Sequence, residues 1–473
     1  MIKQEFDAVV VGSGPNGLAA AITLQQKGLS TLLIEGSSEI GGGLRSAQLT
    51  LPGFTHDICS AIHPLGIASP FFSSLPLEAH GLEWILPPVA AAHPLDTGTT
   101  PFLTRSPETT ADTLGADRDA YLRLISPLIA SWPKLTPELL GPLHLPTHPL
   151  LMARFGWLGI PSVTHLAKQF RTEEARALLA GMAAHAMQPH TNWTTAAVAL
   201  IFLLSAHGAG WPLARYASSK LAASLASYYT SLGGEIRTDT WISHLSQLPS
   251  AKALLLDLTP RQLLQLGGHR WSPLYQRQLE KYRYGMGVFK IDWALDSPIP
   301  WTNAPCREAG TVHLGNSFGE IAAAEALTAK GGHPDRPFVL LTQPSLFDPS
   351  RAPQGKHTAW AYCHVPGGSR VDRTAAIEAQ VERYAPGFRD RILARHTMDT
   401  AQLEEHNPNY VGGDINGGIM DIRQLFTRPA LRRSPYRTSE KNIYLCSSST
   451  PPGGGVHGMC GYHAARRVLK DLF

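Results

Sequence analysis

The length of 473 residues excludes a single ordinary core and indicates about two or three units of domain size. Apolar residues make up 43% and charged residues 16% of the chain, without biased tracts, which argues against disorder. The net charge of +4 is small and Lys and Arg do not cluster, so no nucleic-acid partner is expected.

The cysteines and the N-terminus indicate where the protein works. Five cysteines are scattered and form no C-x-x-C pair, as is typical of a reduced intracellular protein. The N-terminus runs almost directly into a strand, with no secretory signal pattern. The most apolar window, Ala196–Leu204, is shorter than the ~20 residues of a spanning helix and predicts a buried helix or an apolar pocket wall. We expect a cytoplasmic protein, with peripheral membrane contact left open.

The first residues predict a nucleotide-binding unit. Ala8–Val11 is wholly apolar, as in a strand buried on both faces of a parallel sheet. A predicted helix, Leu18–Gln26, and a second strand, Ser30–Ile34, follow, and Glu35 ends that strand. Between the first strand and the helix stands the motif Gly12-Ser13-Gly14-Pro15-Asn16-Gly17.

Each glycine of this motif has a physical role. Gly12 permits a tight turn, Gly14 lets a pyrophosphate approach the backbone, and Gly17 lets the helix pack close to the strand. The phosphates would sit on the helix N-terminus, and Glu35 stands where a carboxylate accepts hydrogen bonds from ribose hydroxyls. Because all parts occur in order, we predict a dinucleotide site rather than a structural glycine turn.

A second glycine cluster, Gly36 and Gly41-Gly42-Gly43-Leu44-Arg45, follows Glu35. In NAD dehydrogenases the second strand usually leads into another crossover helix, whereas a second glycine cluster suits a longer ligand whose phosphates and ribityl chain continue past the first loop. Arg45 is then placed to meet the pyrophosphate or the flavin edge. The alternative is a glycine-rich surface loop. We favour FAD over NAD.

The C-terminal region predicts the other end of the cofactor site. A strand over Asn442–Cys446 precedes a Ser- and Gly-rich loop and a helix over Tyr462–Leu469. A glycine loop that opens a helix offers backbone N–H groups and a positive dipole end, which suit the negatively charged edge of a reduced flavin. The candidate contacts in this loop are Ser448, Gly454, Gly455, Val456 and His457.

These motifs resemble those of the phytoene dehydrogenase-like FAD oxidoreductases, and within them the group related to pyridine nucleotide-disulfide oxidoreductase domain-containing protein 2. The shared segments lie along nearly the whole chain, and the most specific is LCSSSTPPGGGVHGMCGYHAA near the C-terminus. The resemblance implies an α/β fold with a discontinuous Rossmann-type FAD-binding domain and an α+β substrate domain with a mixed sheet, as in monoamine oxidase and carotene desaturases.

The resemblance also implies the domain boundaries. The FAD-binding domain is expected to take residues 1–66, 212–290 and 408–473, and the substrate-binding domain residues 67–211 and 291–407. In the middle piece of the FAD-binding domain, the expected cofactor contacts are Trp241, Ile242, Thr259 and Pro260.

Two features depart from the family pattern. Many relatives have an acidic residue after the last strand, where this chain has Ser447, Ser448 and Ser449. A hydroxyl can make a similar hydrogen bond, so FAD affinity should be retained. Relatives also often carry a glycine pair near Arg215–Ser219, and it is missing here.

Flavin chemistry needs few catalytic side chains. His457 is the best polar candidate near the ring, for a hydrogen bond or for acid/base work, although its backbone N–H alone can also explain its place. Tyr410 and Asp414 are candidates for the cavity wall, with a structural turn as the alternative. For His63, His364 and Trp360 ordinary packing is the simpler interpretation. No metal site is expected, because no ligand motif such as H-E-x-x-H occurs.

The leading hypothesis is an FAD-dependent oxidoreductase that dehydrogenates or desaturates an apolar, isoprenoid, polyene or lipid-like substrate by hydride transfer to flavin N5. The alternatives are an amine oxidase, a non-redox isomerase using reduced FAD and, much less favoured because the phosphate glycines are intact, a non-enzymatic binder of prenylated proteins. The electron acceptor and the oligomeric state are left open.

Overall fold

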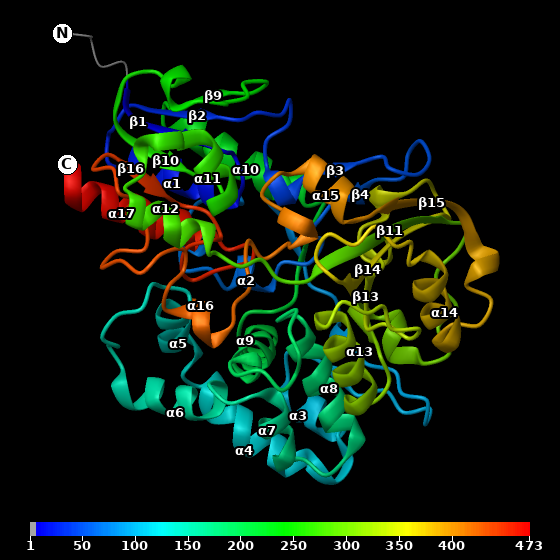
Figure 1. The fold of residues 1–473 in the computed structure, drawn as a ribbon. Helices are drawn as coiled ribbons and strands as arrows, with labels where there is room; N and C mark the ends of the chain where they lie inside the picture. The colour runs from blue at the N-terminus through cyan, green and yellow to red at the C-terminus, as the bar shows by residue number, and fades with distance from the viewer. Residues whose placement is uncertain (1–5) are drawn as a thin grey trace.

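Strands from three distant stretches of the chain pair into one five-stranded parallel sheet, the base of the first lobe (Figure 1). The structure, a computed structural model, describes residues 6–473. In spatial order the strands are β16 (Ile443–Leu445), β10 (Ala251–Leu256), β1 (Phe6–Val11), β2 (Thr31–Ile34) and β9 (Glu235–Arg237).

Both faces of this sheet are buried, because alternate residues of β1 pack against different layers. Ala8 and Val10 belong to the core beneath α1, α10 and α17, whereas Val9 and Val11 belong to the core beneath α11 and α12. The helices are α1 (Pro15–Gln25), α10 (Ser219–Ser231), α17 (Met459–Leu472), α11 (Pro260–Gly267) and α12 (Pro273–Glu280). The predicted strand–loop–helix order at both ends of the chain is therefore present.

The second lobe is built on a seven-stranded sheet that mixes antiparallel pairs with one parallel pair, β12 with β6. In spatial order its strands are β15 (Ile392–Met398), β11 (Gly287–Leu295), β14 (His357–Val365), β13 (Val339–Thr342), β12 (Ala309–Leu314), β6 (Val89–Ala92) and β7 (Phe102–Leu103). Alternation along β14 sends Ala359, Ala361 and Cys363 into a core with α14, and Trp360 and Tyr362 to the opposite face.

Helices cover the second sheet and extend below it (Figure 1). One group is contributed by the chain between the two sheets: α3 (Pro107–Asp112), α4 (Arg118–Ile129), α5 (Trp132–Leu139), α6 (Pro149–Gly159), α7 (Val163–Leu166), α8 (Glu173–Ala184) and α9 (Thr195–Gly208). The others are α2 (Pro64–Ile67), α13 (Phe318–Ala329), α14 (Thr374–Tyr384), α15 (Thr400–His406) and α16 (Ile422–Leu425). The predicted apolar helix is α9.

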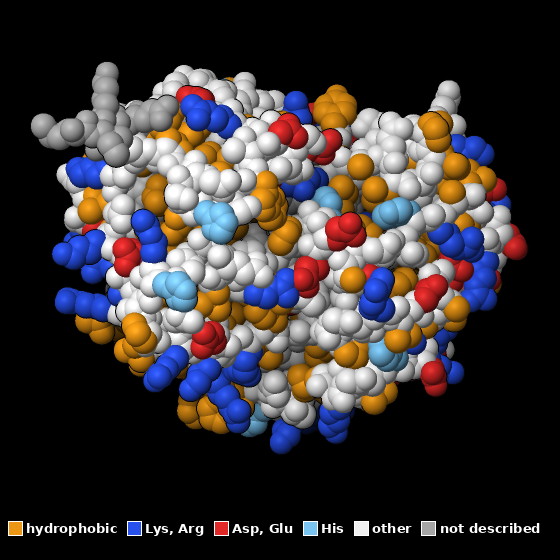
Figure 2. Space-filling view, turned by 45° about the horizontal axis from the view of Figure 1, so that its top comes forward, with side chains coloured by type: hydrophobic (Ala, Val, Ile, Leu, Met, Phe, Trp, Pro, Cys, Tyr) orange, Lys and Arg blue, Asp and Glu red, His pale blue; other side chains and the backbone are white. Residues whose placement is uncertain are grey.

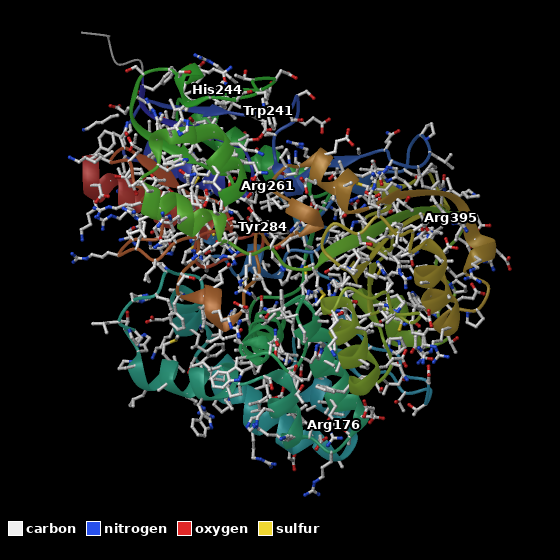
Figure 3. All side chains as sticks on the ribbon, in the orientation of Figure 1. Arg176, Trp241, His244, Arg261, Tyr284 and Arg395 are labelled. Carbon is white, nitrogen blue, oxygen red and sulfur yellow. The ribbon has the colours of Figure 1, made fainter. Side chains whose placement is uncertain are left out.

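The expected fold class, a Rossmann-type lobe joined to an α+β lobe with a mixed sheet, is confirmed. Two short ribbons, β3 (Ser46–Ala47) with β4 (His56–Asp57) and β5 (Trp84–Ile85) with β8 (Leu213–Ala214), lie on the chain that passes between the lobes. Tyr284 also lies on such a connection, whereas Trp241 and Arg261 lie on the first lobe and Arg395 on the second sheet (Figure 3). The exact domain boundaries stay a prediction.

Charges on the outer surface are mixed. On the face shown in Figure 2, Lys and Arg side chains are interspersed with Asp, Glu and apolar side chains. Within residues 6–473, none of the helices has the length and apolar character needed to cross a bilayer.

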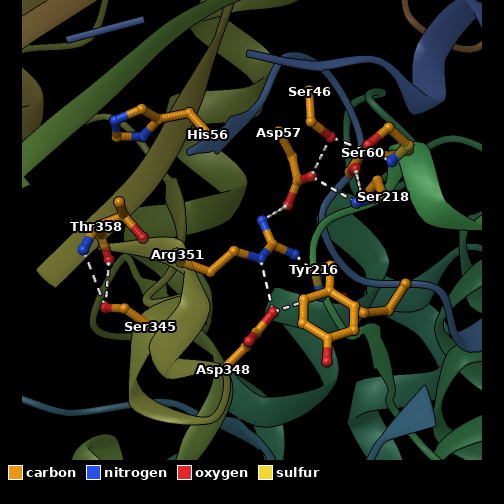
Figure 4. A network of polar contacts seen from close by, with 12 residues as sticks. Ser46, His56, Asp57, Ser60, Tyr216, Ser218, Ser345, Asp348, Arg351 and Thr358 are labelled. Carbon is orange, nitrogen blue, oxygen red and sulfur yellow. Dashed lines mark hydrogen bonds and ion pairs between the residues drawn. The ribbon is translucent and has the colours of Figure 1, made fainter. Parts of the chain in front are cut away.

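A buried ion network joins the segments where the lobes meet (Figure 4). Arg351 donates to Asp57 (Nη1 to Oδ2, 2.9 Å) and to Asp348 (Nε to Oδ2, 3.0 Å), and all three side chains are buried. Its third donor reaches the carbonyl oxygen of Ala214 in β8 at 3.2 Å. Burial would raise the pKa of Asp57, but the Arg351 charge and hydrogen bonds outweigh it and lower the pKa.

The same carboxylates hold the segment where relatives carry a glycine pair. Tyr216 and Ala217 have φ values of 70° and 112°, in the left-handed region that favours glycine. Asp348 accepts the backbone N–H of Tyr216 at 2.7 Å, and Asp57 accepts that of Ser218 at 2.7 Å. The chain therefore keeps a glycine-like backbone without glycine, and the network holds it there.

We expect Ala217→Gly to leave the free energy of unfolding unchanged or to raise it by up to about 1 kcal/mol. Removing left-handed strain gains about 1–2 kcal/mol, while the flexibility of glycine costs about 0.5–1 kcal/mol. Ala223→Gly on the exposed face of α10 is the control and should cost about 1 kcal/mol. Urea denaturation of both variants measures the difference. An equal loss in both would show that residue 217 is not strained.

We expect Arg351→Met to lower the free energy of unfolding at neutral pH by about 3–5 kcal/mol, because two buried carboxylates lose their cation. Arg215→Met, which removes an exposed ion pair with Glu83, should change stability little. Denaturant titration compares the two, and a similar small loss in both would contradict a buried structural network.

Candidate functional site

A cavity of about 820 Å³ extends from the glycine loop of the first lobe to the second sheet and α9. This volume lies within the range of cofactor and ligand sites in proteins. Both chain termini contribute to it, through the loop after β1 and the loop before α17. The cavity therefore joins a polar end at the glycine loop to a mostly apolar end at the second sheet and α9.

The glycine loop has the close approach that a phosphate-binding turn requires. Gly12 has a φ of 98°. A Cβ atom on Gly17 would lie 1.9 Å from the carbonyl oxygen of Gly12, so only glycine lets α1 begin this close to β1. Gly17 itself is packed behind the loop, while Gly12, Ser13, Gly14, Pro15 and Asn16 line the cavity at the N-terminus of α1. The cradle fits the pyrophosphate of a dinucleotide.

Glu35 ends β2 at the wall of the same cavity. Its Oε2 accepts the backbone N–H and the hydroxyl of Ser13 at 2.9 and 2.6 Å, and its Oε1 accepts the N–H of Ser37 at 3.0 Å. Arg45 Nη2 donates to the same Oε1 at 3.1 Å. A carboxylate has about four acceptor sites, so a ribose hydroxyl would have to share or replace one of these donors.

Arg45 is suited to an anion that the protein itself does not supply. Its side chain is buried, and besides the contact with Glu35 it reaches the carbonyl oxygen of His406 at 3.5 Å. Its Nε is covered and has no acceptor among residues 6–473. Because a buried guanidinium N–H without a partner is costly, a phosphate group beside Arg45 would satisfy it.

Asp257 is a residue of the cavity wall that belongs to none of the sequence motifs. It follows β10, and its Oδ2 accepts the N–H of Gly17 at 3.0 Å. A Cβ atom on Gly14 would lie 2.9 Å from the same oxygen. Burial raises the pKa of Asp257 to about 7 against the opposing hydrogen bond from Gly17, and the charge of Glu35 adds to the rise. Its position at the carboxyl end of a strand next to β1 is the signal that identifies it.

The C-terminal loop supplies the wall facing the glycine loop. His457 Nδ1 accepts the N–H of Met459 at 3.0 Å at the start of α17, and Gly455 and Gly458 have φ values of 125° and 68°. Burial lowers the pKa of His457 to about 4 despite hydrogen bonds to the backbone of Gly453 and Gly454. The imidazole is thus a neutral group that ties the loop together.

The three serines that replace the acidic residue of relatives divide their roles. Ser447 Oγ donates to the carbonyl oxygen of Leu258 at 2.7 Å, and Ser449 Oγ donates to that of Gly417 at 2.9 Å. Ser448 lies on the cavity wall, and its hydroxyl has no partner among the described residues. Of the three, Ser448 is therefore the one placed to bind a ribityl hydroxyl.

Most of the expected cofactor residues lie on the cavity wall, and a few do not. Those on the wall, besides the loop after β1, are Glu35, Gly36, Gly42, Gly43, Arg45, Trp241, Ile242, Ser448, Gly454, Gly455, Val456 and His457. Leu44, Thr259 and Pro260 are instead buried beside the wall. Leu44 packs in the core below the second glycine cluster, and the N–H of Thr259 binds Asn409 Oδ1 at 2.9 Å.

The two candidates before the C-terminal strand differ. Tyr410 lies on the wall, and its hydroxyl would be 2.4 Å from a Cβ atom on Gly43. Burial, with Cys59 adding, raises the pKa of Tyr410 well above its usual range. Asp414 is off the wall and accepts the N–H groups of Gly285, Asn416 and Gly418. The turn interpretation therefore holds for Asp414.

The far end of the cavity is mostly apolar. Val198, Ile201 and Phe202 of α9, with Trp211, form one side, and Leu340, Trp360 and Tyr362 of the second sheet form another. His63 lies on the wall between the two ends and its Nε2 contacts Ser218 Oγ at 2.9 Å. His364 is off the wall, paired with Glu325 at 2.8 Å. Across residues 6–473 no cluster of three or more His, Cys, Asp or Glu is placed to hold a metal ion.

Comparisons with known proteins agree with this geometry. Residues 10–73 match the NAD(P)-binding Rossmann-like domain family. The chain is 28% identical to pyridine nucleotide-disulfide oxidoreductase domain-containing protein 2 of Mus musculus, covering 100% of this chain and 94% of the relative. It is 24% identical to a lycopene-forming phytoene desaturase of Pseudescherichia vulneris, covering 98% of this chain and 99% of the relative.

Among solved structures, cyclohexylamine oxidase from Brevibacterium oxydans is similar over 99% of both chains, with a TM-score of 0.61 and 14% identity. That likeness supports the two-lobed fold. The full-length relatives confirm the resemblance to phytoene dehydrogenase-like proteins drawn from the motifs. Together with the Rossmann-like match, these relatives support an FAD-dependent oxidoreductase that is similar to the phytoene desaturases.

Proposed function

We propose that the protein dehydrogenates or desaturates an apolar substrate by hydride transfer to the flavin of FAD. The observation that carries the proposal is the continuity of the cavity, which joins the phosphate-binding glycine loop to an apolar wall. The relative from Pseudescherichia vulneris, a phytoene desaturase, supports it. Bound FAD supplies the hydride acceptor.

The apolar wall would orient the substrate and exclude water. The side chains of Val198, Ile201, Phe202, Leu340 and Trp360 offer no charged group, and burying a hydrocarbon chain against them gains about 25 cal/mol for each Å² removed from water. The charged wall residues Glu35, Arg45, Asp257 and Glu405 belong to segments that form the cofactor end. The charge distribution therefore separates a cofactor end from a substrate end.

The titratable side chains His457 and Tyr410 on the wall would bind and orient ligands, and neither is a strong base. His457 is neutral above about pH 4 and its Nδ1 lone pair is already bound by Met459. Tyr410 stays protonated, because its pKa is raised well above the usual range. The residues thus bind and orient, and the substrate would lose its proton to solvent or to a weakly basic neighbour.

Oxidation of an amine is the second candidate, since cyclohexylamine oxidase shares the fold. Trp360 and Tyr362 lie together on the wall with ring centroids 5.3 Å apart, but their planes are at 85°. Rings in edge-to-face contact do not form two parallel walls around an amine. Because the substrate end also lacks a carboxylate among its described wall residues, the geometry favours a neutral, apolar substrate.

The proposal predicts that the flavin of the purified holoprotein is bleached anaerobically by an apolar polyene or isoprenoid and not by amines. The loss of absorbance in the flavin band at ~450 nm measures the reduction. Val198→Arg would place a cation in the apolar wall and should slow bleaching by at least about tenfold, because burying an unpaired charge is costly. Leu327→Arg, at an exposed position of α13, is the control and should leave the rate unchanged.

Bleaching by amines alone would favour the amine oxidase. No bleaching by any compound of the panel would contradict the redox proposal and favour a non-redox isomerase. Exposing the reduced protein to oxygen and to a quinone then identifies the class of electron acceptor.

Asp257 predicts a pH dependence of FAD binding. The pyrophosphate would add negative charge beside a carboxyl whose pKa is about 7, so the bound state favours the protonated form. The Kd for FAD, measured by fluorescence titration of the apoprotein, should be lowest below about pH 7 and rise by up to about tenfold per pH unit above it. Asp257→Asn keeps an oxygen acceptor for the Gly17 N–H and should make the Kd nearly independent of pH.

A wild-type Kd that is constant between about pH 6 and pH 9 would show that Asp257 does not sense the cofactor. Glu235→Gln, on an exposed residue of β9, is the matched control and should retain the wild-type pH dependence.

A further inference from the structure

The apolar end of the cavity contains a histidine that the proposed function does not use. His185 follows α8 and lies on the wall between the rings of Phe202 and Trp211, with centroids at 4.5 and 6.2 Å. It is half-buried and belongs to the lining of the cavity. The exposed part of its ring must therefore face the cavity rather than the outer solvent.

A second histidine behind the wall orients this ring. His185 Nε2 and His313 Nε2 are 3.1 Å apart, a hydrogen bond between two imidazoles. His313 is wholly buried in β12 and packs against His93 and Phe338. The backbone makes room for it at Gly181, where a Cβ atom would lie 2.6 Å from His313 Nδ1. Side chain and backbone thus hold His313 in one place.

The hydrogen bonds assign the proton of each ring. His313 Nδ1 is covered and has no partner among residues 6–473, so its proton belongs on Nε2, where an acceptor is present. His313 then donates to His185 Nε2. His185 in turn carries its proton on Nδ1, which is not fully covered and binds no described residue. An N–H donor of His185 therefore faces the apolar end of the cavity.

Both rings are neutral at physiological pH. Burial lowers the pKa of His185 to about 3, and burial with the neighbouring His185 and His93 lowers that of His313 well below its usual value. The titratable groups packed around them are histidines and the His364–Glu325 pair. A neutral N–H in an apolar wall selects a neutral oxygen acceptor, because pairing it with a full charge would require desolvating that charge.

We propose that His185, held by His313, is a binding site for a carbonyl or ether oxygen of an otherwise apolar substrate. Calling the bound molecule a substrate rests on the proposed function, but its binding at His185 can be measured without turnover. It narrows the substrate class from hydrocarbons in general to apolar chains that carry an uncharged oxygen. His185 is a specificity-determining residue, and His313 is a positioning residue that acts through it.

The test compares two probes on the holoprotein with oxidised flavin: an isoprenoid methyl ketone, and the hydrocarbon with the same carbon skeleton but a methylene in place of the carbonyl. Titrations followed by the flavin spectrum and by tryptophan fluorescence give a Kd for each. We expect His185→Phe to weaken the ketone about 3- to 10-fold, the worth of one hydrogen bond, and to leave the hydrocarbon unchanged. His185→Gln, which can accept from His313 and donate to the cavity, should restore part of the preference.

Val198→Ala, on the same wall, is the matched control and should weaken both probes alike. His313→Phe should give part of the His185→Phe effect, because His185 loses its orienting partner. If the His185→Phe variant does not retain flavin, the His185→Met variant is used in its place, because it removes the same N–H donor.

An unchanged ratio of the two Kd values in the His185 variants, equal weakening of both probes, or failure of the wild type to bind the ketone would each overturn the proposal. The outcome is separate from that of the redox proposal. A His185-dependent ketone preference without bleaching by any apolar compound would leave the binding site standing and refute the redox function. Bleaching of the flavin without a His185-dependent preference for the ketone would support the redox function and refute the binding site at His185.

Discussion

The cavity depends on the way Arg351 is held between Asp57 and Asp348. Asp348 and Arg351 lie three residues apart, whereas Asp57 comes from a distant segment, and all three side chains are buried together where the lobes meet. A buried guanidinium with three acceptors is stable only while all of them stay in place, because any unpaired member of the set would be a buried charge. The network therefore ties β4, β8 and the segment of Asp348 and Arg351 together where the lobes meet.

This constraint explains a backbone that glycine would normally adopt. Here Tyr216 and Ala217 take positive φ values, a conformation that glycine adopts most easily. The two carboxylates of the network bind the N–H groups on either side of Ala217. Hydrogen bonds to charged acceptors are each worth about 1.5–3 kcal/mol, which is enough to offset left-handed strain of about 1–2 kcal/mol per residue. Hydrogen bonds to Asp348 and Asp57, and not glycine, thus hold this backbone conformation.

The cavity changes in polarity along its length. At the cofactor end, backbone N–H groups, Arg45 and the hydroxyl of Ser448 suit phosphates and a ribityl chain. At the other end the described wall residues carry no carboxylate, Lys or Arg, and His185 is a neutral donor among mostly apolar side chains. Under the proposed function, such a gradient would orient an elongated apolar molecule, because burying an unpaired polar group is costly.

The amino-acid sequence by itself determined the local elements and the cofactor class. The glycine spacing, the apolar strand before it and Glu35 after it are local patterns, and local patterns set turns, strands and helix starts. The resemblance added the pairing of the two chain ends. Asp257, the segment without the glycine pair and the role of Ser447 depend on contacts between residues 240, 132 and 189 positions apart, which no local pattern records.

Tertiary structure alone decided which polar side chains reach the cavity. Asp414 and His457 stand in equally polar loops, yet Asp414 caps a turn behind the wall and the imidazole of His457 is occupied by its own loop. His185 carries no motif and became a candidate only because His313, from another element, turns one of its nitrogens toward an apolar space. The physical reason is that burial and hydrogen-bond partners, and not residue type, set the charge and direction of a buried side chain.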